Sequence, residues 1–268
     1  MNEPTIPIHI QQCTNGVWST EQGNTPAEIP VLLTVNGESW LEFMCTPEFL
    51  EALAVGFLFN EGLIECKADI AQLHVCLAGD NVDVWTIDAI ERPVSWRRTS
   101  GCTGGMTATE FHLGSHEIEY PAARFDLPVH FGNVRITTKQ INEMVFGLFR
   151  AQRLHRLSGG IHASALSNGR ELLLSCEDIG RHNTLDKLAG RILMENITEP
   201  RGVILTTGRI SSEMLQKAAR MGVAVVISIT APTSLAVQLA EKWGLTLIGY
   251  AHGERFKVYA HPERIEAR

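Results

Sequence analysis

The second half of the chain alternates short apolar runs with segments of helical periodicity. Residues 202–206 and 223–229 are apolar almost throughout, which is typical of strands buried on both faces. The segments 211–221 and 232–243 place apolar residues at helical spacing, and each is followed by a glycine. Strands joined by helices in this way predict an α/β fold with a largely parallel sheet flanked by helices. Further expected elements are helices at 137–153 and 182–194 and strands at 161–166, 171–176 and 245–250.

The first half shows a different pattern, in which strands are joined by tight turns. Residues 30–35 and 39–45 flank Asn36-Gly37, a strong hairpin signal. A helix is expected next, with Thr46 as its cap and Pro47 in the first helical position. A second strand pair is expected at 70–77 and 82–90.

These patterns divide the chain into three parts. Residues 1–28 are polar and are expected to form an extended lead-in with an early strand near residues 7–12. Residues 29–135 are expected to form a smaller α+β part, which includes a glycine-rich loop. Residues 136–268 are expected to form the α/β core.

Composition and charge narrow the class of protein. Hydrophobic residues make up 44% and charged residues 20%, which is typical of a globular chain. The net charge of −7 argues against a sequence-independent nucleic-acid binder. No stretch approaches the roughly 18 apolar residues of a membrane helix, and the first residues do not resemble a signal peptide. We therefore expect a cytoplasmic protein with no nucleic-acid or membrane partner.

One of the six cysteines lies in a distinctive context. The chain has no C-x-x-C pair, so the ligand spacing of a zinc site is missing and no metal site is expected. Cys102, however, lies in a glycine-rich loop shortly after Arg97 and Arg98. Nearby cations lower the pKa of a thiol, and a thiolate can carry sulfur as a persulfide. The alternative is that Cys102 is an ordinary turn residue.

Four polar turns are expected at the carboxyl-terminal edge of the predicted parallel sheet. Residues 177–187 follow a strand directly and are dense in ionisable side chains, while 206–212 and 230–234 are strand-to-helix turns rich in hydroxyls. Residues 158–162 form a glycine–histidine turn before a strand. Helix N-termini and hydroxyls bind phosphate, so together these turns suggest a nucleotide-like ligand, although ordinary capping explains each one separately. The candidate binding residues are Gly159, His162, Gly180, Arg181, His182, Asn183, Gly208, Arg209, Thr233 and Ser234.

Several segments, in order along the chain, resemble one family. They are Thr46-Pro47, Glu61-Gly62-Leu63-Ile64, the turn at 158–162, Glu177-Asp178-Ile179-Gly180-Arg181-His182-Asn183 with Asp186-Lys187, Thr207-Gly208-Arg209, Ser212-Glu213-Met214 with Lys217, Ala231-Pro232-Thr233-Ser234-Leu235-Ala236, and Phe256-Lys257-Val258-Tyr259. On these segments the chain resembles the FdhD/NarQ family, the formate dehydrogenase accessory sulfurtransferases.

The resemblance implies a fold and a function. The fold would be a cytidine-deaminase-like α/β core in a homodimer. The function would be to take sulfur from a cysteine desulfurase as a persulfide and to pass it to the molybdenum or tungsten bis(guanine dinucleotide) cofactor of formate dehydrogenase. Cys102 matches the persulfide cysteine, and GDP or GMP would be fragments of the ligand. The matching cofactor-binding segment is Phe256, Lys257, Val258, Tyr259, Ala260 and His261.

The chain departs from the family pattern at one position, and two other functions have to be considered. Many members of the family have a second loop cysteine where this chain has Gly105, which still allows a relay with one cysteine. A zinc deaminase would need H-x-E and P-C-x-x-C, but this chain has His162-Ala163-Ser164 and lacks the cysteine pair. A chaperone that binds the cofactor without carrying sulfur remains the alternative function.

Overall fold

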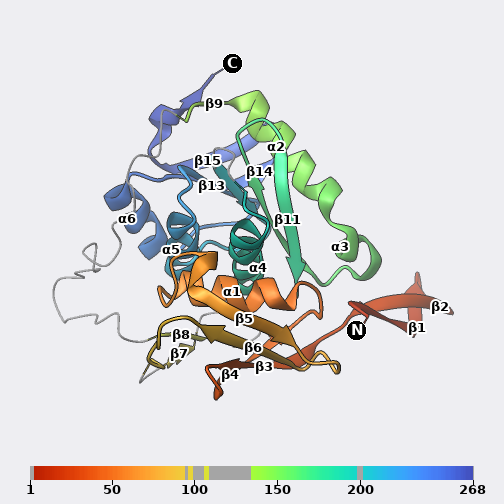
Figure 1. Ribbon diagram of the computed structural model, residues 1–268. Coiled ribbons are helices and arrows are strands. Elements are labelled where there is room, and N and C mark those ends of the chain that lie inside the picture. Colours follow the sequence, from red (N-terminus) through yellow and green to blue (C-terminus); the bar gives the residue numbers. More distant parts are fainter. Residues whose placement is uncertain (1–2, 94–95, 99–105, 109–133, 198–201, 268) are drawn as a thin grey trace.

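The computed structural model describes residues 3–93, 96–98, 106–108, 134–197 and 202–267 (Figure 1). Cys102 and its glycine-rich loop lie outside these residues.

A six-stranded sheet forms the centre of the larger part of the molecule, and it confirms the α/β class. The three consecutive strands β12, β13 and β14 are parallel, whereas the outer strands pair antiparallel to their neighbours. Parallel pairing in this sheet is therefore confined to these three strands. The pairs β10–β11 and β14–β15 are hairpins, and the two strands of a hairpin run antiparallel. In sheet order the strands are β11 (Leu172–Asp178), β10 (His162–Ser167), β12 (Val203–Thr206), β13 (Val225–Ser228), β14 (Thr246–His252) and β15 (Arg255–Ala260).

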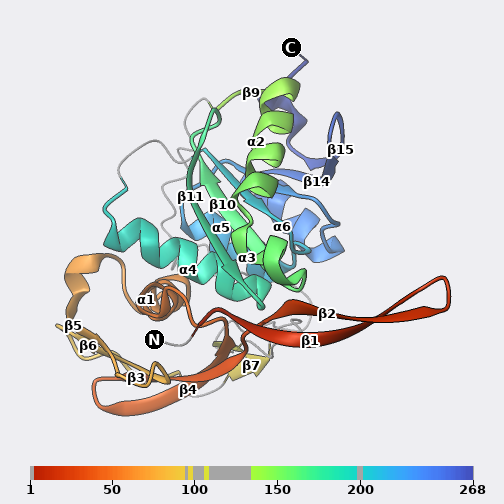
Figure 2. The same cartoon turned by 90° about the vertical axis from the view of Figure 1, so that its right-hand side faces the viewer.

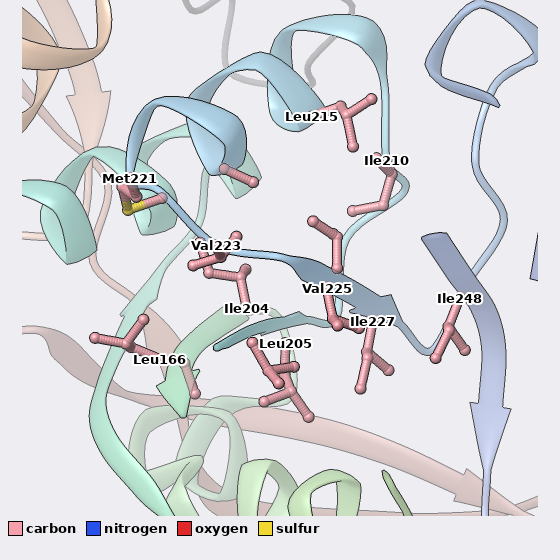
Figure 3. Close-up of a cluster of buried hydrophobic side chains, with 14 of the residues drawn as sticks. Leu166, Ile204, Leu205, Ile210, Leu215, Met221, Val223, Val225, Ile227 and Ile248 are labelled. Atoms are coloured by element: carbon pink, nitrogen blue, oxygen red, sulfur yellow. The ribbon is translucent and has the colours of Figure 1, made fainter. Parts of the chain in front are cut away.

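Helices cover both faces of this sheet (Figures 1 and 2). One face carries α2 (Thr138–Ala151) and α3 (Arg153–Ser158), and the other carries α4 (Arg181–Met194), α5 (Ser212–Arg220) and α6 (Ser234–Trp243). Leu166, Ile204, Leu205 and Ile227 fill the space between strands and helices (Figure 3). The apolar runs of the sequence therefore form the core, as expected for strands buried on both faces.

Local sequence signals set the helix ends in this part. Thr137 and Gln140 form the expected capping box of α2, and Ser211 accepts a hydrogen bond from the Met214 amide at the start of α5. In α6 the cap is Thr233, and Gly244 ends the helix in the left-handed conformation. The predicted boundaries are therefore confirmed to within a few residues.

The smaller part consists of a four-stranded sheet and one helix. The expected hairpin is confirmed as β3 (Ile29–Val35) and β4 (Glu38–Cys45), and the second strand pair as β5 (Ile70–Val75) and β6 (Asn81–Thr86). Helix α1 (Leu50–Asn60) is buried on nearly all sides, because it lies between this sheet and α4 (Figure 1).

The start of α1 corrects a prediction. The helix begins at Leu50 after Phe49, so Thr46 is not its cap and Pro47 is not its first residue. The Thr46 hydroxyl instead accepts a hydrogen bond from the Ile179 amide, at 3.2 Å. A contact with a distant segment therefore replaces the local cap.

The lead-in is a β-hairpin. Strands β1 (Thr5–Thr14) and β2 (Val17–Pro26) pair antiparallel around Asn15 and Gly16, whose φ angles are 54° and 82°. Positive φ at both central residues is the requirement of a tight hairpin turn, which Asn-Gly satisfies. The early strand near residues 7–12 is confirmed, while its partner β2 was not predicted because its sequence is mostly polar after Val17 and Trp18.

The remaining elements are short. They are the 3-10 turns η1 (Lys67–Asp69) and η2 (Pro262–Arg264), the pair β7 (Trp96–Arg98) and β8 (Met106–Ala108), and the pair β9 (Ile136–Thr137) and β16 (Ile265–Glu266).

Helices α1 and α4 are packed backbone to backbone. A Cβ atom added at Gly56 would lie 1.7 Å from the Asp186 carbonyl oxygen, and one added at Gly190 would lie 1.9 Å from the Ala52 carbonyl oxygen. These two glycines therefore allow the smaller part to approach the core.

We expect Gly56→Ala to lower the free energy of unfolding by at least about 1–3 kcal/mol, because the added methyl group must push two helix backbones apart. Urea unfolding followed by circular dichroism measures this loss. The matched control is Gly147→Ala in α2, where the new Cβ would meet only the Leu172 side chain, at 3.2 Å. Equal stability of Gly56→Ala and the wild type would contradict this packing.

Candidate functional site

The sheet topology brings the four predicted turns to one edge. Strand β10 runs antiparallel to β12, so its first residue, His162, lies near the carboxyl end of β12. His162 also pairs with Asp178, at the carboxyl end of β11, and Thr206 of β12 pairs with Ser228 of β13. The turns after β11, β12 and β13 and the turn before β10 therefore share this edge, as the sequence predicted.

Direct contacts connect the turns. The His162 Nδ1 atom lies 3.3 Å from the Thr207 hydroxyl, and the Ser228 hydroxyl donates to the Gly208 carbonyl oxygen at 2.8 Å. A Cβ atom at Gly208 would lie 2.8 Å from the Arg181 Cβ atom, so only glycine leaves room for that side chain. Gly208 thus has a steric role beside Arg181.

The fourth turn is joined through backbone hydrogen bonds. The Ile210 amide donates to the Ala231 carbonyl oxygen at 3.2 Å, and the Thr233 amide donates to the Ile210 carbonyl oxygen at 2.8 Å. Arg209, between these turns, is exposed, whereas Gly180, Arg181 and His182 are buried. Of the other predicted residues, Gly159 ends α3 with a φ angle of 75°, and Ser234 is the first residue of α6.

Two histidines of this edge, His162 and His182, are held neutral. Burial, and then the positive charge of Arg181, lower the pKa of His162. Burial, followed by the charges of Lys217 and Arg181, lowers the pKa of His182 to about 3. At neutral pH both imidazoles therefore offer one hydrogen-bond donor and one acceptor rather than a positive charge.

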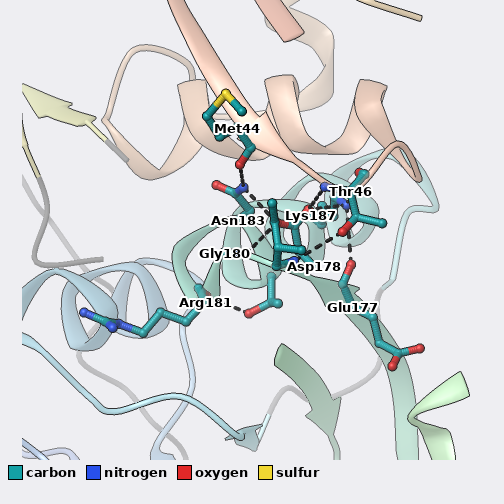
Figure 4. A network of polar contacts seen from close by, with 10 residues as sticks. Met44, Thr46, Glu177, Asp178, Gly180, Arg181, Asn183 and Lys187 are labelled. Carbon is teal, nitrogen blue, oxygen red and sulfur yellow. Dashed lines mark hydrogen bonds and ion pairs between the residues drawn. The ribbon is translucent and has the colours of Figure 1, made fainter. Parts of the chain in front are cut away.

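A buried ion pair lies behind the edge (Figure 4). Lys187 Nζ lies 2.6 Å from Asp178 Oδ2, and both side chains are fully buried. Lys187 also donates to the Thr46 carbonyl oxygen at 3.0 Å, and Asp178 accepts the Thr46 amide at 3.1 Å. The pair thus joins the smaller part of the molecule to the core.

Asn183 also connects the smaller part of the molecule to the core. Its side-chain amide donates to the Met44 carbonyl oxygen and to Asp178, both at 2.9 Å. Asp178 also accepts the Gly180 amide at 2.7 Å, which fixes the turn that precedes α4. Asn183 was predicted to bind a cofactor, and the structure gives its amide nitrogen a structural use; the binding role stays a prediction.

Other acidic groups of the same segment also have structural contacts. The Glu177 carboxylate accepts the backbone amides of Arg153, Leu154 and His155 at 2.8–2.9 Å and so caps α3. Asp186 binds Lys217 at 2.6 Å and accepts the Asn60 amide at 2.7 Å. The density of ionisable residues at 177–187 therefore reflects structural contacts as much as a site.

The predicted cofactor-binding segment, residues 256–261, follows β15. This strand leads away from the end of the sheet that carries the turns, toward the opposite end of the same sheet. Arg255 pairs with His252 at the edge that carries the turns, and Ala260 pairs with Leu247 further along. His261 lies beyond the strand, with its Nδ1 atom 2.8 Å from Glu263 and its Nε2 atom 3.0 Å from the Glu241 carbonyl oxygen. The structure thus brings Phe256 and Lys257 toward the turns but not His261. Tyr259 is half-buried, Val258 is exposed and Ala260 is buried.

Tyr250 is a residue of this edge that the sequence did not indicate. Its φ angle is 52°, an unusual value for a bulky residue, and its amide donates to the Thr230 carbonyl oxygen at 2.9 Å. The residue is 44% exposed, and Lys257 Nζ lies 4.7 Å from the ring centroid. An exposed aromatic ring beside a cation is suited to contact a planar, anionic ligand. No local pattern around Tyr250 signals the positive φ angle.

The described cysteines offer little nucleophilic character inside the fold. Burial raises the pKa of Cys45 to about 12 and that of Cys176 to about 11, so both are neutral thiols at pH 7. Within the described ranges, no group of three or more His, Cys, Asp or Glu side chains is arranged to hold a metal ion. The absence of a metal site stays a prediction.

Among the described residues, no helix combines the length and apolarity needed to span a membrane.

The protein is therefore a two-part α/β protein in which four polar turns lie together at one end of the central sheet. The FdhD/NarQ family model matches residues 26–266, and the chain belongs to this family.

Two curated relatives and one solved structure are similar to this protein over most of its length. The chain is similar to a protein of Staphylococcus haemolyticus named Sulfur carrier protein FdhD, with 36% identity over 90% of this chain and 89% of that one. A Bacillus subtilis protein of the same name is 33% identical over 93% and 95% of the two chains. A crystal structure described as a formate dehydrogenase accessory protein of Desulfotalea psychrophila matches with a TM-score of 0.77 and 25% identity, covering 98% of this chain and 100% of that one.

Proposed function

We propose that the protein is a sulfur carrier that formate dehydrogenase requires for activity. The observation that carries the proposal is the similarity, over about nine-tenths of each chain or more, to proteins named Sulfur carrier protein FdhD. The similarity to an accessory protein of formate dehydrogenase supports the choice of recipient.

The proposed transfer uses Cys102 as a sulfurtransferase nucleophile. Its thiolate attacks the outer sulfur of a persulfide on a cysteine desulfurase, and the desulfurase thiolate leaves. Cys102 then holds the sulfur as a persulfide and passes it to the molybdenum or tungsten bis(guanine dinucleotide) cofactor, which is the substrate of the second transfer. Arg97 and Arg98, which come shortly before Cys102 in the sequence, would favour the thiolate form.

The proposed cofactor site is the sheet edge with the four turns. Arg209 is exposed there, the half-buried His162 is a neutral imidazole, and Tyr250 with Lys257 offers an aromatic face and a charge. A guanine dinucleotide carries the phosphates and the planar ring that these groups suit. On the family resemblance, we further propose a homodimer in the cytoplasm.

The sulfur-transfer step is tested by mass spectrometry after incubation with a cysteine desulfurase and cysteine. A gain of one sulfur atom on the peptide that contains Cys102 is expected. If the protein binds the cofactor while this peptide stays unmodified, the chain is a chaperone rather than a sulfur carrier.

The binding site is tested with GDP. Replacing Arg209 with alanine is expected to weaken GDP binding by about 1–3 kcal/mol, the range for a hydrogen bond to a charged group. Calorimetry measures this change, with Arg170→Ala in the β10–β11 turn as an exposed control away from the edge. A wild-type protein that does not bind GDP, or binds ADP equally well, would refute this placement.

A further inference from the structure

A groove lies between the N-terminal segment, the start of α1 and the β5–β6 turn. Its volume is about 790 Å³, and Pro4, Phe49, Val75 and Leu77 contribute its apolar lining. We call it the Phe49–Leu77 groove. A volume of several hundred Å³ is typical of a binding pocket rather than of a packing defect.

Phe49 is held in an unfavourable conformation at this groove. It precedes α1 with a φ angle of 54° and a ψ angle of 46°, in the left-handed region. Asn and Gly tolerate that region far better than a bulky side chain, and Asn could also cap the helix. The residue is nevertheless 41% exposed, and the Arg191 guanidinium lies 4.7 Å from the centroid of its ring. An exposed phenylalanine at a strained position suggests a use other than stability.

Leu77 provides a second exposed apolar group. It lies in the turn between β5 and β6 and is 99% exposed. Single exposed apolar residues are common, but here two face the same groove from segments that are distant in sequence.

The rim of the groove is acidic. Glu3, Glu48 and Glu51 line it, and Arg153 pairs with Glu48. Glu51 lies in the first turn of α1, where its charge also favours the helix. Carboxylates around an apolar floor complement an apolar side chain that is flanked by cations.

We propose that the Phe49–Leu77 groove binds a peptide segment of a partner protein that presents an apolar side chain flanked by Lys or Arg. Phe49 and Leu77 hold the apolar side chain, and Glu3 and Glu51, which line the groove beside the Arg153–Glu48 pair, contact the flanking cations. This binding does not depend on the sulfur-transfer step or on Cys102.

The test uses a short labelled peptide of leucine and lysine, and a matched peptide in which every lysine is replaced by glutamate. Fluorescence anisotropy at physiological ionic strength is expected to show binding of the lysine peptide at least about tenfold tighter than that of the glutamate peptide. Phe49→Asn and Leu77→Ser are each expected to weaken it by about tenfold. The control is Phe146→Asn, which removes a 49% exposed phenylalanine of α2.

Thermal unfolding separates this role from a structural one. Phe49→Asn is expected to keep or raise the Tm, because asparagine tolerates the left-handed conformation, while peptide binding weakens by about tenfold. Equal binding of the two peptides would overturn the proposal. So would full binding by Phe49→Asn and Leu77→Ser, which would show attraction to the net negative charge alone.

Discussion

Replacing Cys102 with alanine is expected to abolish the activation of formate dehydrogenase, because it removes the thiol that is proposed to carry the sulfur. Co-expression of the variant with the dehydrogenase and an assay of formate oxidation measure the loss. GDP binding by the same variant is expected to stay at the wild-type level, since the sheet edge with the four turns is untouched.

The matched control is Cys66→Ala, which removes an exposed thiol far from the loop in sequence. It is expected to activate the dehydrogenase fully. Full activation by Cys102→Ala would end the persulfide proposal and would favour the chaperone alternative.

Replacing Lys187 with methionine is expected to lower the free energy of unfolding by about 3–5 kcal/mol, because it leaves the Asp178 carboxylate buried without its cation. Both side chains are fully buried and lie 2.6 Å apart. Chemical denaturation measures the loss. The double variant Lys187→Met/Asp178→Asn is expected to recover part of it, since no unpaired charge is left buried and the single amide oxygen can still accept one of the two backbone amides.

An exposed ion pair provides the contrast. Lys139 and Glu143 lie 3.7 Å apart on α2, with Lys139 largely in solvent. Lys139→Met is expected to change stability by no more than about 0.5 kcal/mol, because exposed pairs gain little. A similarly small effect of Lys187→Met would show that the buried pair does not hold the two parts together.

Local signals account for the elements that were predicted correctly. Asn36-Gly37 closes the β3–β4 hairpin, the Thr137 and Gln140 capping box starts α2, and Gly244 ends α6. Each signal acts between residues a few positions apart, where backbone geometry and one or two hydrogen bonds decide the outcome. The polar turns could likewise be placed after buried strands, because apolar strand segments and amphipathic helical segments alternate along the sequence.

The roles of individual polar residues depended on distant segments. Thr46 fits a helix cap by its sequence context, but its amide binds Asp178, which is 132 positions away. Asn183 and Lys187 likewise connect the smaller part of the molecule to the core, although in the sequence their segment resembles a ligand-binding turn. Burial makes an unpaired charge costly, and burial is a property of the assembled fold.

The α/β class, most of the elements, the four turns and the family could all be predicted from the order of the residues. The contacts between the turns, the path of β15 away from them, and the left-handed conformations of Phe49 and Tyr250 became known only from the folded chain. Strand order and side-chain partners depend on contacts between segments far apart in the chain, whereas the patterns of a single sequence report only on neighbours within a turn, a strand or a helix.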